Sequence, residues 1–223
     1  MERGMNRLIS NFRKCTRAAV SAALCLSAPV ASMLAAAPVA AQQVSDLDRA
    51  VEALRGISTM QADFLQTDRA GHQVAGKLTI KRPGKIRFEY QKGVPMLIVG
   101  DGKALTMVDY EVRQVQRWPI GNSPLGALLD PRRDVKRFGT LQPSNDPNVV
   151  SIEVRDRSHP EYGVITLIFL RKPSAPGGLE LVSWVALDSQ NQRTTIRLAN
   201  PRYGMDVSDN AFRFVDPRTA GRR

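Results

Sequence analysis

Few residues in this chain have the types and spacing that chemistry needs. His72 stands beside a turn glycine and His159 precedes a loop proline, positions that favour exposed side chains over a general base or a metal ligand. Residues 101–103 read Asp-Gly-Lys, and an Asp-Gly hairpin turn accounts for them without a catalytic pair. No nucleophile elbow, phosphate loop or His-Glu-x-x-His motif occurs. We therefore predict no catalytic, cofactor-binding or metal-binding residues, with a hydrolase assembled from distant residues as an alternative.

The position of one charged side chain is more informative. Residues 76–90 alternate between apolar and polar side chains around a central Lys-Arg-Pro-Gly turn, which is the pattern of two half-buried antiparallel strands. Arg82 shares the parity of Leu78 and Ile80, so it is predicted to point toward the apolar face. The pattern predicts a concave apolar face with a cation at its rim. A buried structural ion pair and a snorkelling surface side chain are the other interpretations of Arg82.

The elements around this stretch are mostly strands. An apolar stripe predicts a helix over 46–54 with Ser45 or Asp46 as its cap, and Ser123, Pro124 and Pro131 bound a short second helix. Hairpin-length turns separate most of the strands, which favours one antiparallel sheet. Besides 76–90, strand patterns cover residues 60–69, 96–109, 113–118, 149–155, 163–171, 179–188 and 192–199. We predict a mainly β, α+β fold: a curved antiparallel sheet or incomplete barrel, with short helices over its open face.

The first 41 residues read as a secretory signal peptide. A basic start is followed by an Ala-rich apolar run that ends Val-Ala-Ala; a membrane anchor is the competing interpretation. Cys15 and Cys25 both lie in this segment, so the remaining chain has no disulfide and depends on its core for stability. We predict one domain over residues 42–215 and a flexible tail over 216–223.

The formal net charge of +11 narrows the classes of partner. A secreted protein whose basic residues are scattered is not expected to bind nucleic acid. An acidic protein partner or an anionic membrane surface fits the charge, and so does a generally basic solvated surface.

Several short motifs, taken together, resemble those of the LolA family of periplasmic outer-membrane lipoprotein carriers. The resemblance covers most of residues 46–214. It rests on Phe64-x-Gln66, the Gly76-x-Leu78-x-Ile80-Lys81-Arg82-Pro83-Gly84 run, Arg87-Phe88-x-Tyr90, Gly100-Asp101-Gly102-Lys103 and Asn122-Ser123-Pro124-Leu125. Thr106 and Val108 depart from the family, whose members often carry aromatic residues there, and so does Ile86.

The resemblance implies a function and a set of site residues. The family's fold is an incomplete barrel lidded by short helices, and its members shelter the acyl chains of lipoproteins without a cofactor. The implied partners are acylated lipoproteins, an inner-membrane ABC transporter, and an outer-membrane receptor or the outer membrane itself; the carrier acts as a periplasmic monomer. A lipid- or lipoprotein-sensing signalling module of similar fold is the alternative.

By the same resemblance, Arg82 holds the lid shut, and the lid is Leu125, Leu128 and Leu129. Together with the strand alternation, it leads us to expect an acyl-chain cavity lined by Phe64, Leu78, Ile80, Ile86, Phe88, Tyr90, Leu97, Leu105, Met107, Ile152 and Trp184.

Overall fold

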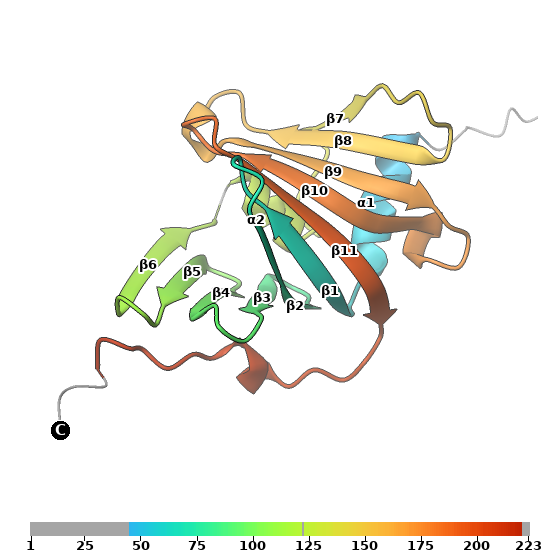
Figure 1. Ribbon diagram of the computed structural model, residues 1–223. Helices are drawn as coiled ribbons and strands as arrows, with labels where there is room; N and C mark the ends of the chain where they lie inside the picture. Colours follow the sequence, from blue (N-terminus) through green and yellow to red (C-terminus); the bar gives the residue numbers. More distant parts are fainter. Residues whose placement is uncertain (1–44, 122, 220–223) are drawn as a thin grey trace, which may run out of the picture. The chain divides into compact units, whose positions relative to one another are not determined.

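Eleven antiparallel strands form a single sheet in the computed structural model, which describes residues 45–121 and 123–219 (Figure 1). Their order across the sheet is β6-β5-β4-β3-β2-β1-β11-β10-β9-β8-β7, so β6 and β7 are the two free edges. The sheet is strongly curved and open, which confirms the predicted incomplete barrel. The strands are β1 (Thr59–Thr67), β2 (Gln73–Lys81), β3 (Lys85–Tyr90), β4 (Met96–Asp101), β5 (Ala104–Asp109), β6 (Gln114–Pro119), β7 (Gly139–Gln142), β8 (Val149–Arg155), β9 (Val164–Arg171), β10 (Leu179–Leu187) and β11 (Arg193–Tyr203).

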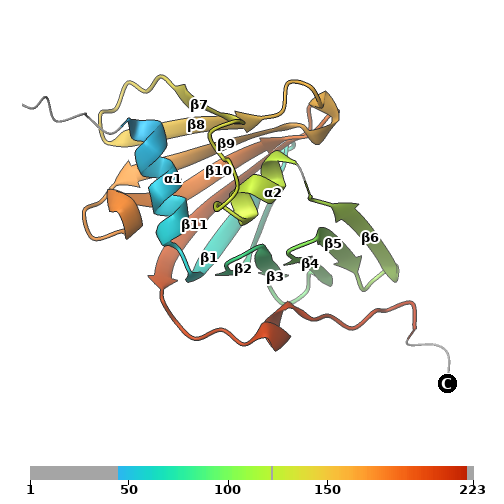
Figure 2. The same ribbon diagram turned by 180° about the vertical axis from the view of Figure 1, so that it is seen from behind.

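Two α-helices cover the same face of the sheet (Figure 2). Helix α1 (Asp46–Gly56) begins where the Ser45 hydroxyl accepts a 3.1 Å hydrogen bond from the Asp48 amide, which confirms the predicted cap. Helix α2 (Pro124–Leu129) lies in the connection between the two edge strands. Three short 3₁₀ turns complete the fold: η1 (Pro160–Tyr162), η2 (Pro176–Gly178) and η3 (Asp209–Phe212).

The predicted signal peptide, residues 1–41, lies outside the described residues, as does the end of the predicted tail, 220–223. Within the part of the chain that the structure describes, no helix is long and apolar enough to cross a bilayer.

Two strands differ from the predictions. Strand β7 was not expected, because its four residues carry no alternation and it forms only an edge. Strand β11 runs past Pro201, because Asn200 takes a positive φ and the register against β1 shifts there. Strand β9 is apolar on both faces, and Leu170 on its outer face is 40% exposed.

The pairing register of β1, β2 and β3 determines how three aromatic rings pack in the core. Gly76 pairs with Phe64 on one side and with Tyr90 on the other. The Phe64 ring therefore meets the Phe88 and Tyr90 rings edge-on, with centroids 5.3 Å apart in both cases. A Cβ on Gly76 would lie 2.3 Å from the Glu89 carbonyl oxygen and 2.6 Å from the Phe64 ring. The absence of a side chain at this position is thus what lets the three rings pack.

We expect Gly76→Ala to lower the free energy of unfolding by about 1–3 kcal/mol, the usual cost of forcing an extra group into a packed core. Gly121→Ala is the matched control, because nothing lies within 4 Å of the Cβ it would add. Urea titrations of both variants measure the difference. Equal stability of the two variants would contradict the packing described for Phe64.

The chain after β11 crosses the outer face of β2, β3 and β4 (Figure 1). Val207 and Phe212 are buried against Val99, with Phe214 packed beside them. The Asp209 carboxylate accepts hydrogen bonds from Lys81 at 2.7 Å and Lys85 at 2.8 Å. It thereby joins the two ends of the turn that carries Arg82.

These two lysines lower the pKa of Asp209 from 3.8 to about 2. A carboxylate with a depressed pKa in the folded state stabilises the fold above its unfolded pKa and loses that contribution as the pH falls through the folded value. We therefore expect Asp209→Asn to be less stable than the parent at pH 7, and the difference to shrink steadily as the pH falls below about 4 and through 2. Thermal melts of both proteins across this range test the assignment. A difference as large at pH 2 as at pH 7 would assign it to something other than the charge.

Candidate functional site

An apolar cavity of about 320 Å³ lies between the inner face of the sheet and the two helices. Side chains from both helices and from eight strands contribute to it. Its lining is Leu54, Gln66, Ile80, Arg82, Ile86, Phe88, Tyr90, Ile98, Leu105, Leu125, Leu128, Leu129, Ile165, Leu167, Leu181, Trp184, Ala186, Thr194 and Ile196. This volume is near the lower end of the range for pockets that hold one drug-sized ligand.

Most of the residues expected at a cavity do lie around it. Ile80, Ile86, Phe88, Tyr90, Leu105 and Trp184 line it together with Arg82 and the three leucines of α2. Phe64 and Leu78 are buried in the same cluster behind that lining, at 3% and 0% exposure. Ile152 is buried in the neighbouring cluster beneath α1, and Met107 shares the inward parity of Ile98 but is not part of the lining.

The placement of Leu97 corrects the expectation from the sequence. Ile98 pairs with Phe88 across β3 and β4 and lines the cavity, so Leu97, which pairs with Glu89, faces the other side of the sheet. Five loop residues separate β3 from β4, and parity cannot be carried across such a loop.

Trp184 is the one residue of the cavity's far wall that was predicted from the sequence. This wall, on β9, β10 and β11, also includes Ile165, Leu167, Leu181 and Ile196. Leu181 and Trp184 both line the cavity although an odd number of positions separates them, because β10 has a register shift between Leu181 and Ser183. Simple alternation cannot predict a bulge of this kind.

Helix α2 closes one side of the cavity with Leu125, Leu128 and Leu129. Ser123 caps its first turn: the hydroxyl accepts a 3.1 Å hydrogen bond from Gly126 N and donates one of 2.9 Å to the Ile120 carbonyl. A helix of six residues is marginal alone. Its position therefore depends on the apolar contacts beneath it and on the polar contacts at its ends.

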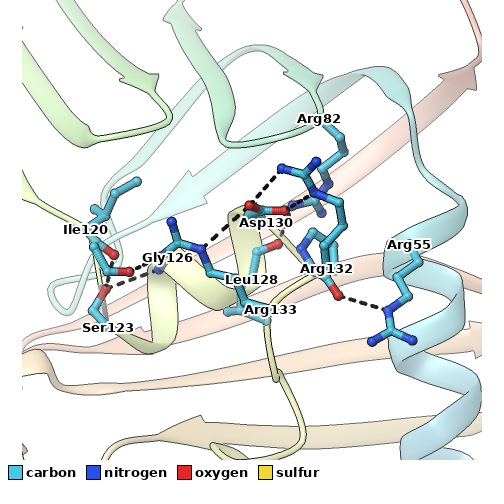
Figure 3. A network of polar contacts seen from close by, with 11 residues as sticks. Arg55, Arg82, Ile120, Ser123, Gly126, Leu128, Asp130, Arg132 and Arg133 are labelled. Atoms are coloured by element: carbon cyan, nitrogen blue, oxygen red, sulfur yellow. Dashed lines mark hydrogen bonds and ion pairs between the residues drawn. The ribbon is translucent and has the colours of Figure 1, made fainter.

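The β2–β3 turn holds the last carbonyls of α2. Arg82 Nη1 donates to the Leu128 carbonyl, and the Gly84 amide donates to the Leu129 carbonyl at 2.8 Å. Figure 3 shows the Arg82 guanidinium beside Leu128 and Asp130 at this end of the helix. The last carbonyls of a helix have no partner inside it, so these two bonds satisfy groups that would otherwise be orphaned. Arg82 thus points inward, as its parity predicts.

The Arg82 guanidinium has only some of its hydrogen bonds satisfied. Its Nε is buried and has no hydrogen-bond partner among the described residues. Burial lowers the pKa of the guanidinium to about 10, with the Asp130 carboxylate acting in the opposite direction, so the group stays charged at neutral pH. A buried cation with unfilled donors makes an arrangement less stable than a fully satisfied one. The contact between the turn and α2 is therefore specific but only moderately strong.

The segment after α2 is tied to its surroundings as well. Asp130 accepts a 2.8 Å hydrogen bond from Arg132, which lowers the pKa of the Asp130 carboxyl, and it lies 3.6 Å from Arg133. Arg55 of α1 donates to the Pro131 carbonyl at 2.9 Å. Figure 3 shows these contacts grouped at the C-terminal end of α2.

The residues first considered for catalysis have other partners. Asp101 accepts 2.8 Å hydrogen bonds from the backbone amides of Lys103 and Ala104, which close the predicted turn. The exposed His72 and His159 each contact a neighbouring carboxylate at 2.9 Å, Asp68 and Glu161 respectively.

Two relatives of this chain share one description. An "Outer-membrane lipoprotein carrier protein" of Chromobacterium violaceum is 38% identical over 121 residues, covering 49% of this chain and 58% of the relative, so the match spans less than two thirds of that protein. A protein of the same description from Dechloromonas aromatica is 28% identical over 183 residues, covering 78% of this chain and 85% of the relative.

Solved structures give a weaker likeness. A LolA superfamily protein from Nitrosomonas europaea is 11% identical, with a TM-score of 0.43 over 74% of this chain and 97% of its own. The Pseudomonas aeruginosa MucA/MucB complex gives a TM-score of 0.43 at 15% identity, over 77% of this chain and 60% of that one.

One family model also matches this chain. The model of "Outer membrane lipoprotein carrier protein LolA" matches residues 55–215, which include the whole sheet, α2 and the Arg82 turn. The chain therefore belongs to the LolA family.

Proposed function

We propose that this protein is a periplasmic carrier that shelters the acyl chains of lipoproteins in its cavity and takes them from the inner to the outer membrane. The observation that supports this most is the pairing of an apolar cavity with a small lid, α2, whose end is held by a partly satisfied buried arginine. Membership of the LolA family and the names of the relatives point the same way.

The size of the cavity requires the lid to open. Three acyl chains need more room than a pocket near the lower limit for one drug-sized ligand offers. Helix α2 contributes Leu125, Leu128 and Leu129 to the lining. Movement of α2 would therefore enlarge the cavity and also supply apolar surface for the chains. The closed arrangement then represents the carrier without cargo, and Arg82 acts as the latch that favours it.

The energetics require help from outside the carrier. Removing three acyl chains of about fifteen CH₂ groups each from a bilayer forfeits more than about 30 kcal/mol of hydrophobic stabilisation. Non-covalent sites do not exceed roughly 18 to 21 kcal/mol. The protein therefore cannot extract a lipoprotein by affinity alone, and an ATP-driven transporter in the inner membrane is the expected donor. The acceptor is an outer-membrane receptor or the outer membrane itself.

Spheroplasts test the proposal. Protein purified from the periplasm of an expressing strain is incubated with energised spheroplasts, and the supernatant is assayed for lipoproteins. We expect lipoproteins to appear in solution in complex with the protein, and not with serum albumin added instead. If the added protein released nothing while its cavity remained intact, the carrier function would be wrong. Capture by a membrane-anchored regulator without release would favour the sensing module.

A further inference from the structure

The polar residues of the cavity lie at two separate places. Arg82 follows the end of β2 and contacts the C-terminal end of α2. The others, Gln66, Tyr90 and Thr194, lie near the opposite end of β2, where β1 and β3 finish and β11 begins. Among the described residues, these three side chains make no hydrogen bond to α2. The first group accounts for the latch, and the second has no role in it.

Gln66 and Tyr90 form an ordered pair. The Tyr90 hydroxyl donates to Gln66 Oε1 at 2.7 Å, and burial raises the pKa of this phenol to about 12, so it stays a donor at neutral pH. Phe64 and Gly76 fix the Tyr90 ring from behind. Because its oxygen is occupied, the Gln66 carboxamide directs its NH₂ group elsewhere. Among the described residues that nitrogen has no hydrogen-bond partner.

A free amide donor is not what a purely apolar ligand requires. Gln66 is only partly buried, so water can pair with its amide while the cavity is empty. An acyl chain beside it would displace that water and leave a polar group unpaired, at a cost in free energy, whereas a leucine at residue 66 would extend the apolar surface. The polar end of an acyl chain, in contrast, is an ester or amide carbonyl, which accepts hydrogen bonds. The Gln66 NH₂ group and the Thr194 hydroxyl are donors that suit such an acceptor.

We propose that Gln66 and Thr194 form a subsite that binds the ester or amide carbonyl at the polar end of an acyl chain, with Tyr90 as the positioning residue for the Gln66 carboxamide. The chain's tail then runs toward Arg82 and the lid. This inference rests on the proposed carrier function and deepens it, because it gives the cargo a direction in the cavity.

The test compares two ligands that differ only in the carbonyl group. Methyl laurate and methyl dodecyl ether are titrated against the purified protein, each displacing fluorescent phenylnaphthylamine. We expect the parent to bind the ester about 2- to 10-fold more tightly, as one net hydrogen bond allows. Gln66→Leu should abolish that preference, so that the variant binds the ester and the ether equally tightly. The double change Gln66→Leu with Tyr90→Phe leaves no orphaned phenol and should behave alike.

Gln61→Leu is the matched control, because Gln61 lies on the same strand but faces the other side of the sheet, where it accepts a hydrogen bond from Arg202. It should retain the preference for the ester. Equal binding of ester and ether by the parent, or an unchanged preference in the double variant, would overturn the subsite while leaving the carrier function intact. If neither ligand bound the parent, the carrier function would fall and the subsite with it.

Discussion

Arg82→Leu is expected to bind lipoprotein normally but to fail in passing it on. The substitution removes the hydrogen bond to the Leu128 carbonyl and the buried cation behind it. A hydrogen bond to a charged group contributes about 1.5–3 kcal/mol, so losing it shifts the balance from the closed, empty state toward the open, loaded one by roughly 10- to 150-fold. The added leucine also extends the apolar lining. Release to an acceptor membrane should slow by a similar factor.

Lys77→Leu is the matched control, because Lys77 lies on β2, the strand that Arg82 follows, and its exposed side chain pairs with Asp63 at the surface. Both variants are loaded from spheroplasts and then mixed with outer-membrane vesicles, and the lipoprotein left in solution is followed over time. We expect Lys77→Leu to release cargo like the parent. Parent-like release from Arg82→Leu would show that the contact with α2 is structural and does not control transfer.

Filling the cavity should abolish binding without unfolding the protein. Ala186 lines the cavity from β10 between Trp184 and the β10–β11 turn. Its replacement by tryptophan places a large apolar side chain in the space that we propose for the acyl chains. Because that side chain occupies existing space, we expect the melting temperature to change little, whereas lipoprotein binding should fall below detection.

Val185→Trp adds the same side chain one position earlier, where strand alternation turns it to the outer face. This control should keep its binding. Binding assays and thermal melts of both variants separate occupation of the cavity from damage to the sheet. Undiminished binding by a folded Ala186→Trp protein would place the acyl chains somewhere other than this cavity.

Local patterns in the sequence predicted the near wall of the cavity because the turns there are short. The alternation of β2 continues into β3 through the tight turn at Arg82, and Leu78 and Phe88 face each other in the paired register. The inward direction of Arg82 follows from the same count. The caps of α1 and α2 were predictable for a similar reason, since a capping side chain and its helix lie within a few residues of each other.

Features that depend on distant parts of the chain were not predictable. The side on which Leu97 lies depends on pairing across a five-residue loop. The far wall depends on a bulge in β10, which brings Leu181 and Trp184 to one face. The contact between Arg82 and the Leu128 carbonyl joins residues 46 positions apart, and its geometry arises only when the whole sheet curves under the lid.

The proposed sheltering of acyl chains in the cavity is tested most directly by comparing one lipoprotein with and without its acyl chains. The purified protein is mixed with the acylated form, diluted out of detergent, and with the same polypeptide whose lipid-bearing cysteine is replaced by serine; the mixtures are then separated by size. We expect the acylated form to co-elute with the protein as a soluble complex and the unacylated form to elute alone. Co-elution of both forms, or of neither, would contradict a cavity that shelters acyl chains.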